Sequence, residues 1–309
     1  MRKLLVGIGV FFIGVAVIWK IGIAPGMEKR FPANWHYNFD ILGRTSYADA
    51  TTGKFPEGTT LKDAPINISK RDITVSQVNA DGTVELTDHF VTYDTELDDI
   101  TWELTTKATV DSVTGKYTNP EYANDYYFMP RDAQKTTYSI RNNYLNGVPF
   151  AFQNEENISG INTYHYSYKG DYNNTVSNPD VKLEPDQTII CFNLAVDFWV
   201  EPTTGEIVKY HEWCEGDWVV NTKTNEKLYA ISRWGSDNTG DDLIRRAAEV
   251  RGILNTTNMN RFYIPLLLVI AGLATLAFAL LPPYFKNRSQ KTAEKNPAKT
   301  ATSEVKAAL

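Results

Sequence analysis

Two apolar runs bracket this chain, one from Leu4 to Ala24 and the other from Phe262 to Phe285. Each has about 20 residues or more, which is enough to cross a hydrocarbon core of roughly 30 Å as a helix. We therefore predict transmembrane helices over residues 4–24 and 261–285. A cleaved signal peptide is the alternative for the first run, but its apolar stretch is long, and Pro25 stands where a small residue would favour cleavage.

Basic residues at the two ends predict the orientation of the chain. Arg2 and Lys3 precede the first run, and six Lys or Arg residues follow the second. Short basic segments stay on the cytoplasmic side of a cell membrane. We therefore expect residues 1–3 and 286–309 to be cytoplasmic and residues 25–260 to be extracytoplasmic. The tail over 286–309 has too few apolar residues to fold and should be disordered, and its basic start suits anionic lipid headgroups.

Charge is distributed unevenly between these parts. The chain has 31 basic and 37 acidic residues, but ten of the basic and only two of the acidic residues lie outside residues 25–260, which leaves that segment a net charge of −14. Such a surface repels nucleic acid, whose binding needs clustered Lys and Arg, so we expect no nucleic-acid partner. It would attract cations or a basic partner, although solubility alone is the simpler explanation.

The segment between the spans has the patterns of a mainly β protein. Strand-like residues over 73–78 and 83–93 flank a turn, which predicts a hairpin, and 100–110 predicts the next strand. From Phe192 onward the sequence alternates, with an apolar face typical of a sheet that covers a core. The residues expected on that face are Phe192, Leu194, Val196, Phe198 and Val200.

These patterns predict an antiparallel curved sheet, followed by one juxtamembrane helix over 240–255. The helix begins with acidic residues, as the helix dipole prefers, and continues with an apolar stripe. The segments ATVDSVTGKYTN and DFWVEPTTGEIVKY each contain a Thr-Gly turn, at Gly115 and Gly205. This similarity raises the hypothesis of two similar β units over 34–140 and 141–238.

The two cysteines, Cys191 and Cys214, flank two strand-like runs joined by a turn that ends at Gly205. Folding this hairpin brings them nearly opposite each other, within disulfide reach, and an extracytoplasmic compartment permits oxidation. We therefore predict a disulfide, with two buried free thiols as the alternative. Glycosylation sequons stand at four asparagines of the same segment: Asn67, Asn157, Asn173 and Asn255.

Chemistry-bearing motifs are scarce. No two of the four histidines have metal-ligand spacing on a helix, and no His-Glu-x-x-His, Gly-x-Ser-x-Gly or phosphate-binding glycine loop occurs. His165 and His211 lie on predicted strands and could be neighbours, but two ordinary half-exposed side chains are the simpler interpretation. The acidic stretch 237–242 suits helix capping better than calcium binding. We therefore assign no catalytic, cofactor or metal residue.

Small residues recur in both apolar runs and allow helices to approach closely. They could pair the two spans or join copies of the chain into a homo-oligomer, although a simple anchor needs neither. The residues concerned are Gly7, Gly14, Ala271, Thr275 and Ala279.

One hairpin carries a resemblance to a known family. The segment FWVEPTTGEIVKYHEW, with Trp199, Glu201, Pro202, Thr204 and Gly205, follows a β-rich region and precedes the terminal span. Together with the basic start and the segment IGIAPGMEKRFPANW, this order resembles the porin PorA-like family of two-pass membrane proteins, whose function is largely unassigned. The resemblance implies no single-chain pore, because a porin crosses the membrane with strands and this chain has apolar helices.

The leading hypothesis is a non-enzymatic, two-pass cell-surface protein that binds or scaffolds in the cell envelope. Its partner would be membrane lipid, an envelope protein, or an apolar or lipid ligand in the concavity of the sheet. The alternative is a subunit of a membrane pore or transport complex. An extracytoplasmic hydrolase is less favoured, because no catalytic constellation is present.

Overall fold

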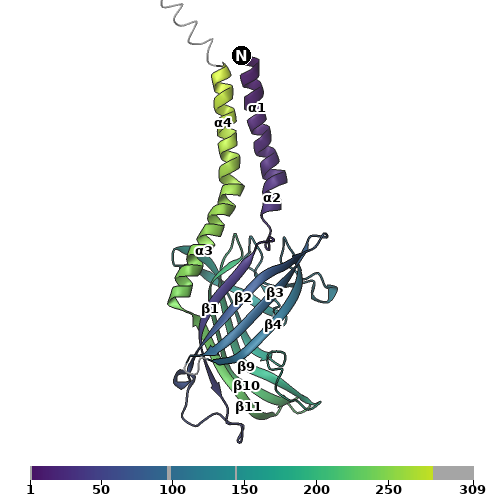
Figure 1. Ribbon diagram of the computed structural model, residues 1–309, viewed down its shortest axis with the longest axis vertical. Helices are drawn as coiled ribbons and strands as arrows, with labels where there is room; N and C mark the ends of the chain where they lie inside the picture. Colours follow the sequence, from purple (N-terminus) through teal and green to yellow (C-terminus); the bar gives the residue numbers. More distant parts are fainter. Residues whose placement is uncertain (1, 96–98, 143–144, 281–309) are drawn as a thin grey trace, which may run out of the picture. The chain divides into compact units, whose positions relative to one another are not determined.

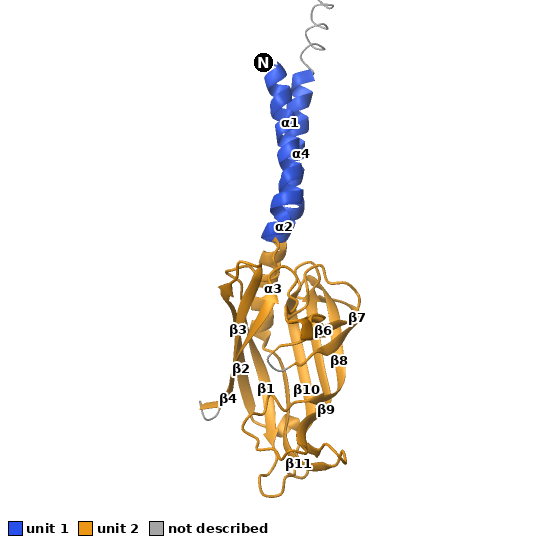
Figure 2. Ribbon diagram, turned by 90° about the vertical axis from the view of Figure 1, so that its right-hand side faces the viewer, with its two compact units in different colours: residues 1–27, 256–309 blue, residues 28–255 orange. Residues whose placement is uncertain are grey.

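The structure, a computed structural model, divides the chain into two compact units (Figure 2). One unit comprises residues 1–27 and 256–309, and the other is Glu28–Asn255. The described residues are 2–95, 99–142 and 145–280. The predicted end of the second span, 281–285, and the tail expected to be disordered, 286–309, therefore lie outside the described residues.

Two long helices contain the apolar runs (Figure 1). The first consists of α1 (Arg2–Ile18), a π-helical segment (Trp19–Ile23) and α2 (Ala24–Met27). The second consists of α3 (Gly240–Asn258), a π-helical segment (Met259–Tyr263) and α4 (Ile264–Leu280). Both are long and apolar enough to cross a membrane. The expected helix over 240–255 is present, but it continues into the second apolar run without a break.

A π-helical segment precedes the proline of each helix, Pro25 or Pro265. Proline has no backbone N–H to donate to the preceding turn, and a π-bulge shifts the hydrogen bonds by one residue. The backbone N–H of the residue before each proline then donates a hydrogen bond to the carbonyl oxygen five residues earlier. These bonds are Ala24 N–H to Trp19 O and Ile264 N–H to Met259 O. The indole N–H of Trp19 also donates to Asn260 O at 3.2 Å, which joins the two π-helical segments.

Helices α1 and α4 pack together through glycines that the sequence pattern did not single out. A Cβ added to Gly9 would meet Leu276 Cγ at 2.7 Å, and one added to Gly272 would meet Gly9 O at 2.8 Å. Ala279 is buried in agreement with the prediction, whereas Gly7 and Gly14 have nothing within 4 Å of an added Cβ. The close approach is therefore centred on the pair Gly9 and Gly272 rather than on Gly7 and Gly14.

The other unit contains one 11-stranded sheet that curls into a half-barrel (Figure 1). The strands are β1 (His36–Tyr47), β2 (Ile66–Val78), β3 (Thr83–Asp94), β4 (Asp99–Asp111), β5 (Asp125–Tyr126), β6 (Tyr138–Ile140), β7 (Val148–Ile158), β8 (Ile161–Asn173), β9 (Gln187–Glu201), β10 (Glu206–Asn221) and β11 (Lys227–Asn238). Their order in the sheet is β4-β3-β2-β1-β11-β10-β9-β8-β7-β6-β5. The predicted hairpin and the strand after it correspond to β2, β3 and β4.

The sheet is mixed, so the expectation of a purely antiparallel sheet was wrong in one pair. Strands β5 and β6 are parallel, whereas the other neighbours are antiparallel. After β5 the chain leaves the sheet and buries Tyr127, Phe128 and Met129 in the core. Because it returns to the sheet only at Tyr138, this connection is long enough to start the next strand in the same direction.

The two segments proposed as similar β units, 34–140 and 141–238, belong to the same sheet. Strand β1 from the first segment pairs with β11 from the second, from Ile41 opposite Asn238 to Tyr47 opposite Ser232. This pairing joins the chain across almost 200 residues and makes the two segments one compact unit with a shared core.

Apolar side chains from both sides of the curl form that core, in which aromatic rings predominate. Rings of this size bury large apolar areas and fill the space between the facing strands. Outside the curl, Ala247 and Val250 of α3 pack with Ile161 of β8 and Val208 of β10. The aromatic residues of the main core are Phe31, Trp35, Tyr37, Phe39, Phe90, Tyr127, Phe128, Phe150, Tyr166, Phe198 and Tyr210.

Candidate functional site

The half-barrel contains a partly open cavity of about 200 Å³ between its facing strands. Its walls come from β1 to β4 on one side and from β8 to β11 on the other, with residues 174–178 along one margin. Aromatic, hydroxyl and amide side chains predominate in the lining, together with two carboxyl groups. The charged and ring-bearing residues of the lining include Arg44, Phe90, Trp102, Tyr172, Glu212, Asp217 and Trp234.

Asp217 lies in this wall with only 1% of its surface exposed. Its Oδ2 accepts hydrogen bonds from Trp234 Nε1 at 2.9 Å and Ser232 Oγ at 3.3 Å, and its Oδ1 accepts one from Asn174 Nδ2 at 2.9 Å. Burial raises the pKa of Asp217 above its ordinary value, although the three hydrogen bonds lower it in part. The group is thus held by neutral donors in a place that disfavours its charge.

Glu212, on the same strand, is 8% exposed and also lines the cavity. Its Oε1 accepts a hydrogen bond from Ser236 Oγ at 2.6 Å, and its Oε2 accepts one from Tyr210. Burial again raises the pKa of the carboxyl, and the two hydroxyl donors offset only part of the effect. Both acids were missed in the sequence. The available signal was two acidic residues close to Cys214 on one strand, Glu212 two residues before it and Asp217 three residues after it.

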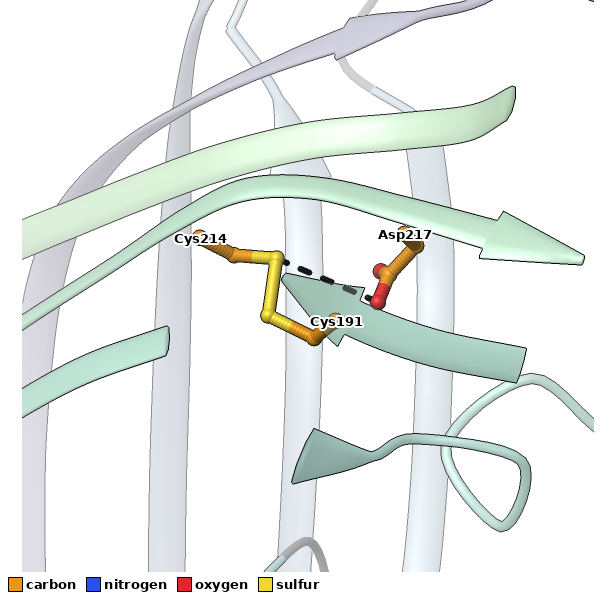
Figure 3. Close-up of side chains that lie close together, drawn as sticks. All are labelled: Cys191, Cys214 and Asp217. Carbon is orange, nitrogen blue, oxygen red and sulfur yellow. Dashed lines mark hydrogen bonds between the residues drawn. A yellow bond between two sulfur atoms is a disulfide. The ribbon is translucent and has the colours of Figure 1, made fainter. Parts of the chain in front are cut away.

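The predicted disulfide between Cys191 and Cys214 is present (Figure 3). Both cysteines are fully buried, and their Cα atoms are 6.1 Å apart. Asn193 has a φ of 49°, and the register of β8 against β9 shifts at this point. Because of this irregularity Cys191 faces the core. Phe192, which was expected there, instead has its ring centroid 3.6 Å from Lys227 Nζ. That expectation for Phe192 was wrong.

Asp217 Oδ1 lies 3.9 Å from Cys214 Sγ (Figure 3). The two sulfurs and this carboxylate are close enough together to suggest metal ligands. Metal binding requires thiolates, however, and both sulfurs are engaged in the disulfide. The trio is therefore a disulfide in contact with one carboxyl group of the cavity lining, and not a metal centre.

The hairpin that carries the family resemblance forms a tight turn between β9 and β10. The carboxylate of Glu201 accepts hydrogen bonds from the backbone N–H groups of Thr203 and Thr204 at 3.1 and 2.8 Å. Gly205 has a φ of 75°, and an added Cβ would lie 2.6 Å from the carbonyl oxygens of Met129 and Pro130. Only glycine fits this position without strain.

The remaining residues of the motif have structural contacts as well. The carbonyl of Pro202 accepts a backbone hydrogen bond from Ala133 N–H at 2.8 Å. Trp199 lies on the outer face, stacks on His165 at 4.5 Å and donates to Glu156 Oε2 at 2.9 Å. The motif therefore anchors the connection between β5 and β6 to the β9–β10 turn, away from the cavity.

Glu206, directly after this motif, is the centre of a buried ionic network. Its Oε1 accepts a hydrogen bond from Arg30 Nη1 at 2.7 Å, and its Oε2 accepts one from Arg246 Nη2 at 3.3 Å. Arg30 also donates to Gly205 O at 3.1 Å. Burial raises the pKa of Glu206, but the two guanidinium groups outweigh burial and lower it below its ordinary value. One carboxylate thus ties the start of this unit, the β9–β10 turn and α3 together.

All four histidines lie beside a carboxylate from a neighbouring strand. His165 Nε2 is 2.7 Å from Asp197 Oδ1, and His211, opposite Asp197 in register, is 2.8 Å from Asp237. The two histidines therefore lie on either side of Asp197, and the hydrogen bond with Asp237 raises the pKa of His211. The other two pairs are His36 with Asp72 and His89 with Glu103.

The acidic stretch at the start of α3 acts as a cap. Thr239 Oγ1 accepts a hydrogen bond from Asp242 N–H at 2.9 Å, the arrangement of a helix N-cap. Asp242 in turn accepts hydrogen bonds from Asp40 N–H and from Asn238. Its carboxylate oxygens are thus already used within the protein, in line with the capping interpretation.

The sequon asparagines differ in accessibility. Asn157, Asn173 and Asn255 are exposed. Asn67 is half-buried in the cavity wall, where its Nδ2 donates to Thr45 Oγ1 at 2.9 Å. Glycosylation at these positions stays a prediction, and the structure makes Asn67 the least accessible of the four.

Comparison with known proteins identifies a family over almost the whole chain. The family model described as Porin PorA matches residues 3–281. No curated protein sequence matches the chain. Among solved structures, the chain is similar to a Nitrosomonas europaea protein assigned as AttH, with 9% identity and a TM-score of 0.20, over 65% of this chain and 50% of that one. The chain thus spans about half the length of that protein, and a TM-score this low carries no argument.

Proposed function

Because the chain belongs to the Porin PorA family, we propose that it is a membrane-anchored, non-enzymatic protein of the cell envelope whose half-barrel binds a small ligand. The cavity between the facing strands supports this proposal. A volume of about 200 Å³ lies below the roughly 300–1,000 Å³ of pockets for drug-sized ligands. It therefore favours a small molecule over a lipid chain, with membrane lipid and an envelope protein as further partners.

The two long apolar helices support anchoring in a membrane with both chain ends on the cytoplasmic side. Basic residues flank the two apolar runs at their outer ends, as the positive-inside rule requires of cytoplasmic segments. The Cys191–Cys214 disulfide suits an oxidising, extracytoplasmic compartment for the half-barrel. The proposed ligand would then be one that reaches the outer side of the membrane.

Native mass spectrometry of the full chain tests ligand binding directly. Protein purified from its own membrane should carry a small molecule in a fraction of the population. Ser177 lines the cavity, so Ser177→Trp should fill it and reduce that fraction strongly. Val176 is 67% exposed and does not line the cavity, so Val176→Trp is the matched control. Equal occupancy in the two variants would contradict binding in the cavity.

A subunit of a membrane pore is the second candidate. The description of the family as Porin PorA favours it, as do the faces of α1 around Gly7 and Gly14, which have open space beside them and could contact another copy. Planar-bilayer recordings of the purified chain test whether it forms a conducting pore. Stepwise currents that disappear in Gly14→Leu, while the half-barrel stays folded, would favour a helical channel over a binding protein.

A further inference from the structure

Two carboxyl groups that line the cavity form no ion pair with any basic side chain in the described part of the half-barrel. Several other interior acids are ion-paired, for example Asp88 with Arg71 at 2.5 Å, and the buried Glu201 accepts backbone N–H groups of its own turn. Asp217 and Glu212 are at least nine-tenths buried, and among the described residues neither forms an ion pair. The hydrogen bonds that they accept come from neutral groups. A buried carboxylate normally pairs with a cation or becomes neutral.

Both groups line the same cavity, so a ligand could supply the missing charge. Among the described residues of the lining, the one basic side chain is Arg44, which is half-buried and donates to Ala64 O at 2.5 Å. When both acids are ionised, two carboxylates against one guanidinium give the lining an excess of negative charge. Arg71 also acts on Glu212 through space, but its guanidinium forms the ion pair with Asp88.

Aromatic rings line the cavity beside these acids. Trp234 donates from its indole N–H to Asp217 at 2.9 Å, so its ring lies next to that carboxylate. Across the cavity, Trp102 and Phe90 pack edge to face, with their ring centroids 5.1 Å apart. Aromatic faces attract a cation electrostatically, Trp most strongly, and aromatic cages recognise quaternary ammonium groups.

We propose that the ligand of this cavity is a small organic cation, an alkylammonium compound held by Glu212 and Asp217 and covered by the aromatic walls. This inference rests on the proposed function, because it names the class of ligand for the same cavity. Each feature has a separate role: the carboxylates provide the opposite charge, the rings accept the alkyl groups, and the limited volume selects a small molecule. The net charge of −14 on residues 25–260 would raise the local concentration of cations.

A pair of isosteric probes separates charge from shape. Choline and 3,3-dimethylbutan-1-ol have nearly the same size and shape, but only choline is charged. We expect the full chain, stripped of bound ligand in detergent, to bind choline at least about tenfold more tightly than 3,3-dimethylbutan-1-ol, as measured by calorimetry. Equal affinity for the two probes, or binding of neither, would overturn the inference. The native mass spectrometry described above tests the proposed function separately, whichever probe binds.

Charge-neutral variants test which groups hold the cation. Glu212→Gln and Asp217→Asn should each lower the affinity for choline by about tenfold or more. Neither variant should change the affinity for 3,3-dimethylbutan-1-ol. Glu215 is an exposed neighbour on the same strand, and Glu215→Gln should leave both affinities unchanged. If Asp217→Asn fails to fold, Glu212→Gln alone decides, because the hydroxyl groups around it can accept as well as donate. Unchanged choline affinity in the folded variants would refute the assignment.

Discussion

At the scale of residues, three buried carboxyl groups of the half-barrel, Glu206, Glu212 and Asp217, represent two kinds of environment. Glu206 has guanidinium groups on both sides, and its pKa is lowered. Glu212 and Asp217 have only neutral donors, and burial raises the pKa of each. The first kind stabilises the fold when it is charged, whereas the second kind is least costly when it is neutral. The two kinds therefore predict opposite dependence of stability on pH.

The first prediction concerns Glu206. Glu206→Gln should lower the free energy of unfolding by roughly 3–5 kcal/mol, because it leaves the buried Arg30 without its counter-charge and Arg246 with only the partly exposed Glu249. Glu249→Gln is the control, since Glu249 bonds the same Arg246 but is 40% exposed; it should cost less than about 1 kcal/mol. Denaturant titration near neutral pH measures both. Because the pKa of Glu206 is lowered, its contribution is lost as the pH falls through its folded pKa.

The second prediction concerns Glu212. A carboxyl with a raised folded pKa contributes stability that is fully present below its unfolded pKa, near 4.5, and lost as the pH rises through the folded value. Glu212→Gln does not titrate there, so it should be more stable than the natural protein at pH 8 by roughly 1–3 kcal/mol and equally stable at pH 4. If the free energies of unfolding of the natural protein and of Glu212→Gln follow parallel curves from pH 4 to 8, the pKa of Glu212 is not raised in the folded state.

At the scale of elements, helices α1 and α4 depend on two glycines for their close approach. In a membrane, helix association relies on packing and not on the exclusion of water, so small residues at the contact are decisive. Gly9 and Gly272 each lie against the backbone of the other helix. Pairing within the chain thus uses one face of α1 and leaves Gly7 and Gly14 on open surface.

The third prediction tests this contact. Gly9→Leu should separate α1 from α4, because even a Cβ at Gly9 would meet atoms of Leu276 and Gly272 at 2.7–2.9 Å. Cysteines introduced at Ala16 and in the facing turn of α4, in a background without Cys191 and Cys214, should then crosslink less efficiently in membranes. Gly7→Leu has open space and should leave crosslinking unchanged. If both variants crosslink alike, Gly9 is not the contact.

At the scale of the whole molecule, charge and hydropathy divide the chain into parts that suit different surroundings. The segment 25–260 is acidic, and the chain ends beyond the apolar runs are basic. A transmembrane orientation with basic ends inside places each part where its charge is favourable. Anchoring at both ends would also keep the half-barrel close to the membrane surface, which suits a ligand supplied there.

The fourth prediction is the topology. Protease added to intact cells should digest residues within 25–260 and leave a tag after Leu309 protected, because that tag would be cytoplasmic. Permeabilised cells are the control and should lose the tag. A C-terminal tag that is lost from intact cells would contradict the two-span orientation, and an N-terminal tag missing from mature protein would indicate cleavage of the first run.

Much of the architecture was already determined by the sequence, because its signals are local. Hydropathy over about 20 residues indicates a span, alternation indicates a strand facing a core, and turn residues indicate a hairpin. These signals located both apolar helices, the β2–β3 hairpin and α3. The Cys191–Cys214 disulfide was predictable for the same reason, since one hairpin connects its two strands.

Only the tertiary structure decided how distant segments meet. The β1–β11 pairing, the parallel β5–β6 pair and the bulge at Asn193 depend on contacts that no local pattern encodes. The link from Arg30 to Glu206 spans 176 residues, and the acids of the cavity become unusual only when the opposite wall leaves them without a counter-charge. The sequence does not distinguish an acidic residue on a solvated surface from one in a buried interior. Its surroundings in the folded protein determine its pKa and its function.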